Sequence, residues 1–341
     1  MIVTPVDPHD EAAFDEWFDV LHVTDQERWP DNPGWLRVER QAMALDHDGP
    51  VAHRCVIARC AEGQVCGIGE LELPRRENLD LAEVDVRVLP AARRAGVGSA
   101  IVAALEEMAM AAGRTELSGW DEVPERPGYP DATRPFARHH GFSAVQQNVR
   151  RELRLPLGPD RVRALTEGPK ARPVGYTMIT FTDRWPDELI EDRCELGRRM
   201  STDAPKGDQE LDEEVWDEQR VRQVEAALAA QNRVKIITAA RHDASGRAVG
   251  FTELAVPLGA PVSVWQHDTL VLREHRGRGL GFAMKVANVL ALAERYPEAR
   301  TVSTWNAADN EHMIATNEEI GFGVTARSTT WRKTLRGPVL P

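Results

Sequence analysis

The hydrophobic pattern of the chain changes from strand-like to helical around residues 265–295. Residues 270–272 are all apolar, and a turn rich in glycine and arginine follows at residues 276–281. After the turn, apolar side chains recur at the three- or four-residue spacing of one helix face, at Phe282, Val286, Val289, Leu290 and Ala293. The pattern predicts a strand, a glycine turn and a helix in direct succession.

The same order of elements occurs earlier in the chain. Valines at positions 84, 86 and 88 alternate with Asp85 and Arg87, and a second glycine turn follows at residues 93–98. The helical stripe that comes next contains Ile101, Leu105, Met108 and Ala109. The chain therefore contains two copies of one strand–turn–helix pattern.

Further features repeat at nearly one offset. Arg93, Gly96 and Gly98 each lie 183 positions before a matching residue of the second turn (276 minus 93, for example). Trp120 and Trp305 follow at an offset of 185, and two Gly-Phe pairs follow at an offset of 180. We infer a duplication of whole domains, with a first domain at 1–157, a linker at 158–173 and a second domain at 174–341.

Composition limits the class of protein. The chain has 341 residues, enough for about two ordinary domains, and 42% hydrophobic with 28% charged residues is typical of globular proteins. No apolar run approaches the roughly 18 residues of a membrane span, and the N-terminus lacks the pattern of a signal peptide, so we expect a cytoplasmic protein that does not bind membranes. The four cysteines form no Cys-x-x-Cys pair, and we expect no metal.

The net charge suggests what kind of partner to expect. A formal charge of −12 argues against nucleic-acid binding, which needs a basic face. It suits a cationic acceptor such as a small amine, although many acidic proteins carry such charge for solubility alone.

The two glycine turns have the chemistry of an anion site. The first backbone N–H groups of a helix lack intrahelical partners and lie at the positive end of the helix dipole. Glycines at 277, 279 and 281 remove Cβ atoms that would keep a phosphate away, and Arg276 and Arg278 add positive charge. The turn lacks the Lys-Ser/Thr ending of a nucleotide-triphosphatase loop. An ordinary turn between strand and helix is the alternative, which the second copy makes less attractive.

Arginine-x-x-glycine-x-glycine after a strand resembles the pyrophosphate loop of the GNAT superfamily of N-acetyltransferases. The resemblance implies an α/β fold of two tandem domains, each a mixed, mostly antiparallel sheet flanked by helices, and acetyl-CoA as co-substrate. The layout is similar in plan to mycothiol-synthase-like tandem acetyltransferases. The residues that it implies for cofactor binding are Val271, Leu272, Arg276, Gly277, Arg278, Gly279, Leu280, Gly281, Asn306 and Asn310 in the second half and Val88, Arg93, Arg94, Gly96 and Gly98 in the first.

The resemblance also implies the chemistry, which is direct attack of an amine on the thioester, assisted by a general base. Strand alternation places His267, Thr269 and Val271 on one face and Gln266, Asp268 and Leu270 on the other. The family's base is often a glutamate at the place of His267. We therefore predict His267 as the base, with Asp268 in reserve. A histidine hydrogen-bonded within its strand is the alternative.

The sequence departs from the family at the general acid. Many members carry a tyrosine four residues before the Gly-Phe pair, where this chain has Asn317 and Ala137. An asparagine cannot donate a proton as an acid would, so the thiolate takes its proton elsewhere or leaves unassisted. The first half departs further, with Ala95 in the loop and Asp121 at the place of Asn306. We expect the second half to be the catalyst and the first to be degenerate.

Two other functions remain open at this stage. One is a CoA-binding regulatory protein without turnover, which the missing tyrosines favour. The other is an acyltransferase with a different acyl donor, such as aminoacyl-tRNA, which the acidic charge disfavours. The sequence is compatible with a monomer or a homodimer and does not identify the acceptor.

Overall fold

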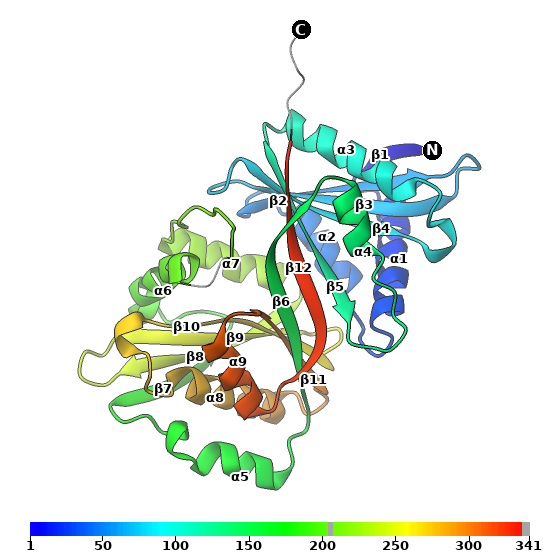
Figure 1. The fold of residues 1–341 in the computed structure, drawn as a ribbon. Coiled ribbons are helices and arrows are strands. Elements are labelled where there is room, and N and C mark those ends of the chain that lie inside the picture. The colour runs from blue at the N-terminus through cyan, green and yellow to red at the C-terminus, as the bar shows by residue number, and fades with distance from the viewer. Residues whose placement is uncertain (204–206, 336–341) are drawn as a thin grey trace. The chain divides into compact units, whose positions relative to one another are not determined.

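The computed structural model describes residues 1–203 and 207–335 (Figure 1). The first part of the chain forms β1 (Ile2–Val6), α1 (Glu11–Arg28), α2 (Arg37–Leu45), β2 (Val51–Arg59), β3 (Val65–Pro74), β4 (Leu81–Val88), η1 (Pro90–Ala92), α3 (Val97–Ala111), β5 (Glu116–Pro124) and α4 (Thr133–His139). A long strand, β6 (Ser143–Arg154), follows.

The second part repeats this plan after a short helical segment, α5 (Pro159–Glu167) and η2 (Pro169–Ala171). It forms β7 (Tyr176–Thr182), η3 (Asp187–Leu189), α6 (Ile190–Asp203), α7 (Glu218–Ala230), β8 (Arg233–His242), β9 (Ala248–Pro257), β10 (Ser263–Val271), η4 (Arg273–His275), α8 (Leu280–Arg295), β11 (Thr301–Ala307), α9 (Glu311–Ile320) and β12 (Gly323–Thr334). Among the described helices, none is long and apolar enough to cross a membrane.

The chain divides into two compact units that do not follow the chain in simple order. Unit 1 holds Met1–Gln147, Gly207–Gln209 and residues 327–335, and its strands lie in the order β1-β2-β3-β4-β5-β12. Unit 2 holds residues 148–203 and Glu210–Ala326, with the order β6-β11-β10-β9-β8-β7. Each unit is a mixed sheet, because β4 and β5 run parallel, as do β10 and β11, while the other pairs with a determined register are antiparallel.

The two units exchange their closing strands. Residues 148–154 of β6 pair antiparallel with the whole of β11 in unit 2. Residues 327–334 of β12 belong to unit 1, where Trp331 donates from Nε1 to Asp121 at 2.9 Å and joins the hydrophobic core. The expected boundaries, 1–157 and 174–341, do not describe this exchange, because the alternating pattern of a strand does not show which sheet the strand joins. The expected linker also contains α5, which lies in unit 2.

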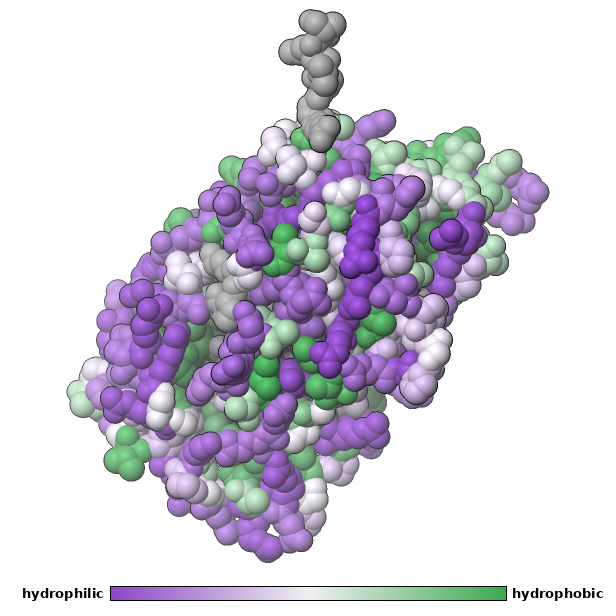
Figure 2. Space-filling model, viewed as in Figure 1, coloured by the Kyte–Doolittle hydropathy of each residue, from purple (hydrophilic) through white to green (hydrophobic). Residues whose placement is uncertain are grey.

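Helices cover both faces of each sheet (Figure 1). In unit 2, α8 packs Phe282 and Val286 against Ile236 and Leu254 on one face. On the other face, α6 lies over a cluster that includes Phe251. Each such buried side chain stabilises the fold by about 1.5–3 kcal/mol relative to exposure. The face of the molecule seen in Figure 2 is mainly hydrophilic, as the charged content of 28% requires.

In each unit the two central parallel strands separate soon after they begin. β10 pairs with β11 only over three residues, Ser263 to Trp265, and β4 pairs with β5 only from Leu81 to Glu83. Within the described residues, the ladders between these parallel strands do not continue beyond these pairs. The opening leads directly to the glycine turn in both units.

Candidate active site

The second glycine turn forms an open anion site at the start of α8. Gly277 and Gly279 have φ values of 75° and 78°, a left-handed conformation that other residues rarely adopt. No side chain caps the helix, and a Cβ atom at Gly281 would meet nothing within 4 Å. The first N–H groups of α8 therefore face open space, and a phosphate can approach them.

Arg276 braces this turn. Its Nε atom donates to the carbonyl of Val271 at 2.9 Å, and its Nη2 atom pairs with the buried carboxylate of Asp203 at 2.7 Å. Half of the positive charge expected in the turn is thus neutralised by α6. Arg278 is exposed, with its guanidinium 5.8 Å from the ring of Tyr176.

A β-bulge interrupts β10 at the two predicted base candidates. Gln266 is opposite Leu254 of β9, but Thr269 is opposite Thr252, so β10 has one extra residue at this point. His267 and Asp268 occupy the bulge, opposite Glu253. The side chain of His267 is half-buried and that of Asp268 is exposed.

The bulge overturns the predicted alternation of faces. Gln266 donates from Nε2 to the hydroxyl of Thr252 at 3.0 Å, and Thr269 bonds to the same hydroxyl at 2.7 Å. Gln266 and Thr269 therefore lie on one face, although strict alternation assigned them to opposite faces. The extra residue shifts the pleat by one position, which no single strand's sequence reveals.

The electrostatics around the bulge are dominated by a buried ion pair. Glu253 is 2% exposed, and its Oε2 atom lies 2.5 Å from Nζ of Lys235. Burial opposes ionisation of Glu253, but the ammonium of Lys235 prevails and lowers the pKa of the carboxyl. Its Oε1 atom is buried and has no hydrogen-bond partner within the described part of the chain. A buried acceptor of this kind is available to a donor from a ligand.

The pKa values of the two bulge residues are shifted in opposite directions. Burial, reinforced by the charge of Lys235, lowers the pKa of His267 to about 4. The imidazole is therefore neutral at pH 7. Displacement of water by the surrounding protein, followed by the nearby charge of Glu253, raises the pKa of the Asp268 carboxyl, although its side chain still reaches solvent.

Three asparagines lie on β11, at the N-cap of α9 and within α9. Asn310 caps α9 by accepting from the backbone N–H of Met313 at 3.2 Å. Asn317 is fully buried and donates from Nδ2 to Oδ1 of Asn306 at 2.6 Å. Asn306 lies three residues beyond Ser303, the last β11 residue paired with β10, and thus borders the opening between these strands. The side chain of Asn317 also accepts from Lys285 of α8 at 3.0 Å.

Sequence comparison agrees with this geometry in both halves. The profile of the acetyltransferase (GNAT) family matches residues 14–142 and 198–322. The chain belongs to the GNAT family. It is 33% identical over 136 residues to mycothiol acetyltransferase of Geodermatophilus obscurus, a match that covers 39% of this chain and 41% of that protein. The alignment thus spans about two fifths of the length of this curated relative.

Two solved structures are similar to this chain over nearly its whole length. A tandem GNAT protein from the clavulanic acid biosynthesis pathway superposes with a TM-score of 0.81 and 29% identity, over 98% of this chain and 99% of that one. A GCN5-related N-acetyltransferase from Sphaerobacter thermophilus gives a TM-score of 0.69 over 99% and 96% of the two chains. At 19% identity, this second likeness shows the fold alone.

The glycine turn of unit 1 is held by an arginine in the same way, but a side chain covers its approach for a phosphate. Arg93 donates from Nε to the carbonyl of Val88 at 3.2 Å and pairs with Glu27 at 2.8 Å. Gly96 has a φ of 82°, but Arg94 takes a φ of 64° at the position of Gly277. A Cβ atom at Gly98 would lie 3.0 Å from the ring of Phe136, which covers the start of α3.

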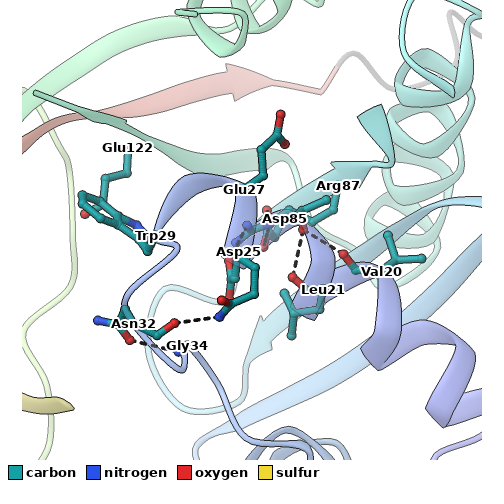
Figure 3. Close-up of polar contacts among 12 residues, drawn as sticks. Val20, Leu21, Asp25, Glu27, Trp29, Asn32, Gly34, Asp85, Arg87 and Glu122 are labelled. Atoms are coloured by element: carbon teal, nitrogen blue, oxygen red, sulfur yellow. Dashed lines mark hydrogen bonds and ion pairs between the residues drawn. The ribbon is translucent and has the colours of Figure 1, made fainter. Parts of the chain in front are cut away.

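The strands that border the opening in unit 1 carry ion pairs in place of the bulge. The β3–β4 ladder runs without a register shift. Arg87 donates to Asp25 and to Asp85, each at 2.8 Å (Figure 3). Burial opposes the charge of this guanidinium, but the two carboxylates prevail and raise its pKa. Trp29 donates from Nε1 to Glu122 at 3.1 Å beside them. The side chains of Arg87 and Trp29 beside this opening are thus bound to carboxylates of unit 1 itself.

Elsewhere in unit 1, three possible metal ligands lie together. The donor atoms of His53, Glu70 and Glu72 are within 4.8 Å of one another. The guanidinium of Arg40 pairs with Glu70 and places a positive charge where a cation would bind. The arrangement therefore resembles a buried ion-pair network more than a metal centre.

Sequence reasoning missed several residues of unit 2. Glu253 and Asp203 lie far from the glycine motif in sequence, and only the sheet and α6 bring them to it. A cavity of about 760 Å³ borders the turn between α6, the start of α7 and the β8–β9 hairpin, and its lining includes Glu195, Trp216 and His275. Lys285 is the strongest of the missed signals, because a lysine within an apolar helical stripe is unusual.

Proposed function

We propose that unit 2 is the catalyst of an acetyl-CoA-dependent N-acetyltransferase that acts on a small amine. One observation carries the proposal: the open glycine turn, the separation of β10 from β11 and the bulge with Asp268 occur together in unit 2. Unit 1 keeps the turn and the separation but lacks the bulge, and Phe136 covers its turn. Unit 1 is then a structural partner of the catalyst.

Cofactor binding follows from the backbone. The pyrophosphate of acetyl-CoA sits on the first N–H groups of α8, where Gly281 leaves room. The pantetheine arm lies in the opening between β10 and β11 and adds strand-like hydrogen bonds to the unpaired edges. Each such bond contributes about 0.5–1.5 kcal/mol, and the bonds to the pyrophosphate about 1.5–3 kcal/mol each, so that micromolar binding is within reach.

Acetyl transfer then proceeds by direct attack. The amine nitrogen attacks the thioester carbonyl carbon, the new C–N bond forms and the C–S bond breaks with its electron pair on sulfur. The ammonium form of the amine first loses one proton to a base and so becomes nucleophilic. After the attack the nitrogen loses a second proton to solvent, and the thiolate takes one proton from solvent. Fully buried Asn317 stands where many family members carry an acidic tyrosine, so the leaving sulfur receives no proton from that position.

We favour Asp268 as the base because its side chain is the more exposed of the two bulge residues. The neutral imidazole of His267, with a pKa of about 4, binds a proton too weakly to take one from an ammonium ion efficiently. Asp268 is exposed in the bulge, and its raised pKa brings the carboxylate nearer to the operating pH. We assign proton removal to Asp268, directly or through one water, and leave His267 as its neutral neighbour.

The acceptor oxygens at the bulge suit an acceptor that donates hydrogen bonds, such as an amine. An amine arrives largely as an ammonium ion at neutral pH. Asp268 and the unpartnered Oε1 atom of Glu253 offer it acceptor oxygens, beside the positive charges of Lys235 and Arg193. The mycothiol acetyltransferase name of the G. obscurus relative supports acetyl transfer as the reaction class.

Calorimetric titration of acetyl-CoA into the Gly281→Trp variant tests the assignment of the cofactor site. A Cβ atom at Gly281 meets nothing within 4 Å, so the variant folds while the indole blocks the phosphates. Gly158→Trp is the matched control, because Gly158 is exposed and has the same free space. We expect loss of binding in Gly281→Trp alone. Unchanged affinity in the folded variant would refute the site.

A further inference from the structure

Lys285 is a buried lysine without a counter-ion. It lies on α8 with 1% of its surface exposed, and it makes no ion pair within the described residues. Its Nζ atom donates one hydrogen bond, to Oδ1 of Asn317 at 3.0 Å, and lies 5.6 Å from the ring centre of Phe322. Burial lowers the pKa of this ammonium to about 7. Burial of a lysine without a counter-ion is unfavourable in free energy, which suggests that this residue has a specific role.

The lysine fixes the direction of a hydrogen-bond chain. Nζ of Lys285 donates to Oδ1 of Asn317, so the Nδ2 atom of this amide points away from the lysine. Nδ2 of Asn317 then donates to Asn306, which must present Oδ1 to it. The amide orientation of an asparagine is ordinarily set only by its partners. Here the amino group of one lysine sets the orientation of two amides in sequence.

The last amide in this hydrogen-bond chain keeps its donor group unused among the described residues. Because Oδ1 of Asn306 is engaged by Asn317, its Nδ2 group is the part left to interact elsewhere. No group in the described part of the chain accepts from this Nδ2 atom. Asn306 is half-buried on the stretch of β11 that no longer pairs with β10. A donor at this place requires an acceptor, and a carbonyl oxygen is the acceptor that an acyl thioester with its amide-containing arm offers.

We propose that Lys285 and Asn317 are positioning residues that hold the Asn306 amide with its N–H groups toward acyl-CoA, so that Asn306 donates to a carbonyl oxygen of that ligand. The inference rests on the proposed function of unit 2 and adds the polarity of one contact. It also gives Asn317 a role: at the position where many family members carry a tyrosine as general acid, this asparagine connects Lys285 to Asn306.

Asn317→Asp tests this polarity with almost no change of shape. The carboxylate of this variant can only accept, so one oxygen pairs with Lys285 and the other draws Nδ2 of Asn306 toward itself. Asn306 must then turn Oδ1 toward the ligand carbonyl, where two acceptors repel. The new ion pair with Lys285 keeps the fold, and we expect the unfolding temperature to stay the same or rise. The dissociation constant of acetyl-CoA should rise about tenfold or more.

Two further variants complete the test. Asn306→Asp still accepts from Asn317 but loses the donor toward the ligand, so it should weaken acetyl-CoA binding to a similar extent. Ala315→Asp adds the same charge at an exposed position of α9 and should leave binding unchanged. In both Asn→Asp variants the expected change is in affinity, which a purely structural role of the chain would not produce in a folded protein.

The outcomes separate this inference from the function on which it rests. Weaker binding in Asn317→Asp and Asn306→Asp, with Ala315→Asp unchanged, supports the proposed polarity. Acetyl-CoA binding within about threefold of the unaltered chain in either Asn→Asp variant overturns it and leaves the acetyltransferase proposal standing. Absence of acetyl-CoA binding to the unaltered chain overturns both.

Discussion

The Nε atom of Arg276 donates to the carbonyl of Val271 at 2.9 Å, and this bond fixes the start of the glycine turn. Asp203 of α6 holds the other side of the same guanidinium. Unit 1 repeats the arrangement with Arg93 and Val88, where Glu27 supplies the carboxylate. The arginine of the GNAT motif therefore acts in this chain by shaping the turn.

Removal of the brace should weaken cofactor binding without unfolding unit 2. Arg276→Ala frees the turn, and the N–H groups of α8 must then be ordered when a phosphate binds. We expect the dissociation constant of acetyl-CoA to rise about tenfold by calorimetry. Arg300→Ala removes an exposed arginine that also donates to backbone carbonyls and serves as the control. Equal affinity of the two variants would argue against a role for the brace.

Asp268 and His267 should differ sharply in their effect on turnover. Asp268→Asn removes the proposed base and should lower kcat about 10²-fold while acetyl-CoA affinity changes little. His267→Ala should lower kcat less than about tenfold, because the imidazole is neutral above its pKa of about 4. The pH profiles of kcat/KM of the intact chain and of His267→Ala should accordingly have the same shape near pH 6.5. The reverse ranking would return the base role to His267.

Lys285 should make stability depend on pH. Its pKa is lowered to about 7, whereas an unfolded lysine titrates near 10.4. Between these values the unfolded chain binds more protons, so the unfolding free energy contributed by this group rises with pH, and the contribution is lost as pH falls through 7. Relative to Lys285→Met, the intact chain should gain about 1.4 kcal/mol per pH unit within that window. Parallel denaturation curves across pH 6–10 would contradict the buried charge.

The strand exchange predicts that the C-terminal strand stabilises the N-terminal unit. Trp331→Ala removes a side chain that is 3% exposed in the unit 1 core and leaves Asp121 without its indole donor. A loss of about 3–5 kcal/mol is expected, visible as faster hydrogen exchange in β3 and β5. Trp120→Ala, at a side chain that is 53% exposed, is the control. Faster hydrogen exchange confined to β10 and β11 would contradict the placement of the C-terminal strand in unit 1.

The sequence predicts the local parts of this fold well. The turns fall where Gly96 and Gly279 take left-handed φ values, because glycine spacing and helix periodicity are properties of one segment. The bulge at His267 and the destination of β12 depend on partner strands, which one segment does not specify. Lys285 was detectable in principle, since it interrupts the apolar stripe between Phe282 and Val289.

Release of free thiol from acetyl-CoA, measured with a panel of small amines, tests the central claim most directly. The intact chain should release thiol with at least one amine, in proportion to amine concentration. Gly281→Trp should abolish this activity and Gly158→Trp should retain it. If acetyl-CoA binds to the intact chain but no amine raises thiol release above spontaneous hydrolysis, unit 2 is a CoA-binding module without turnover, and the proposed acetyltransferase activity is wrong.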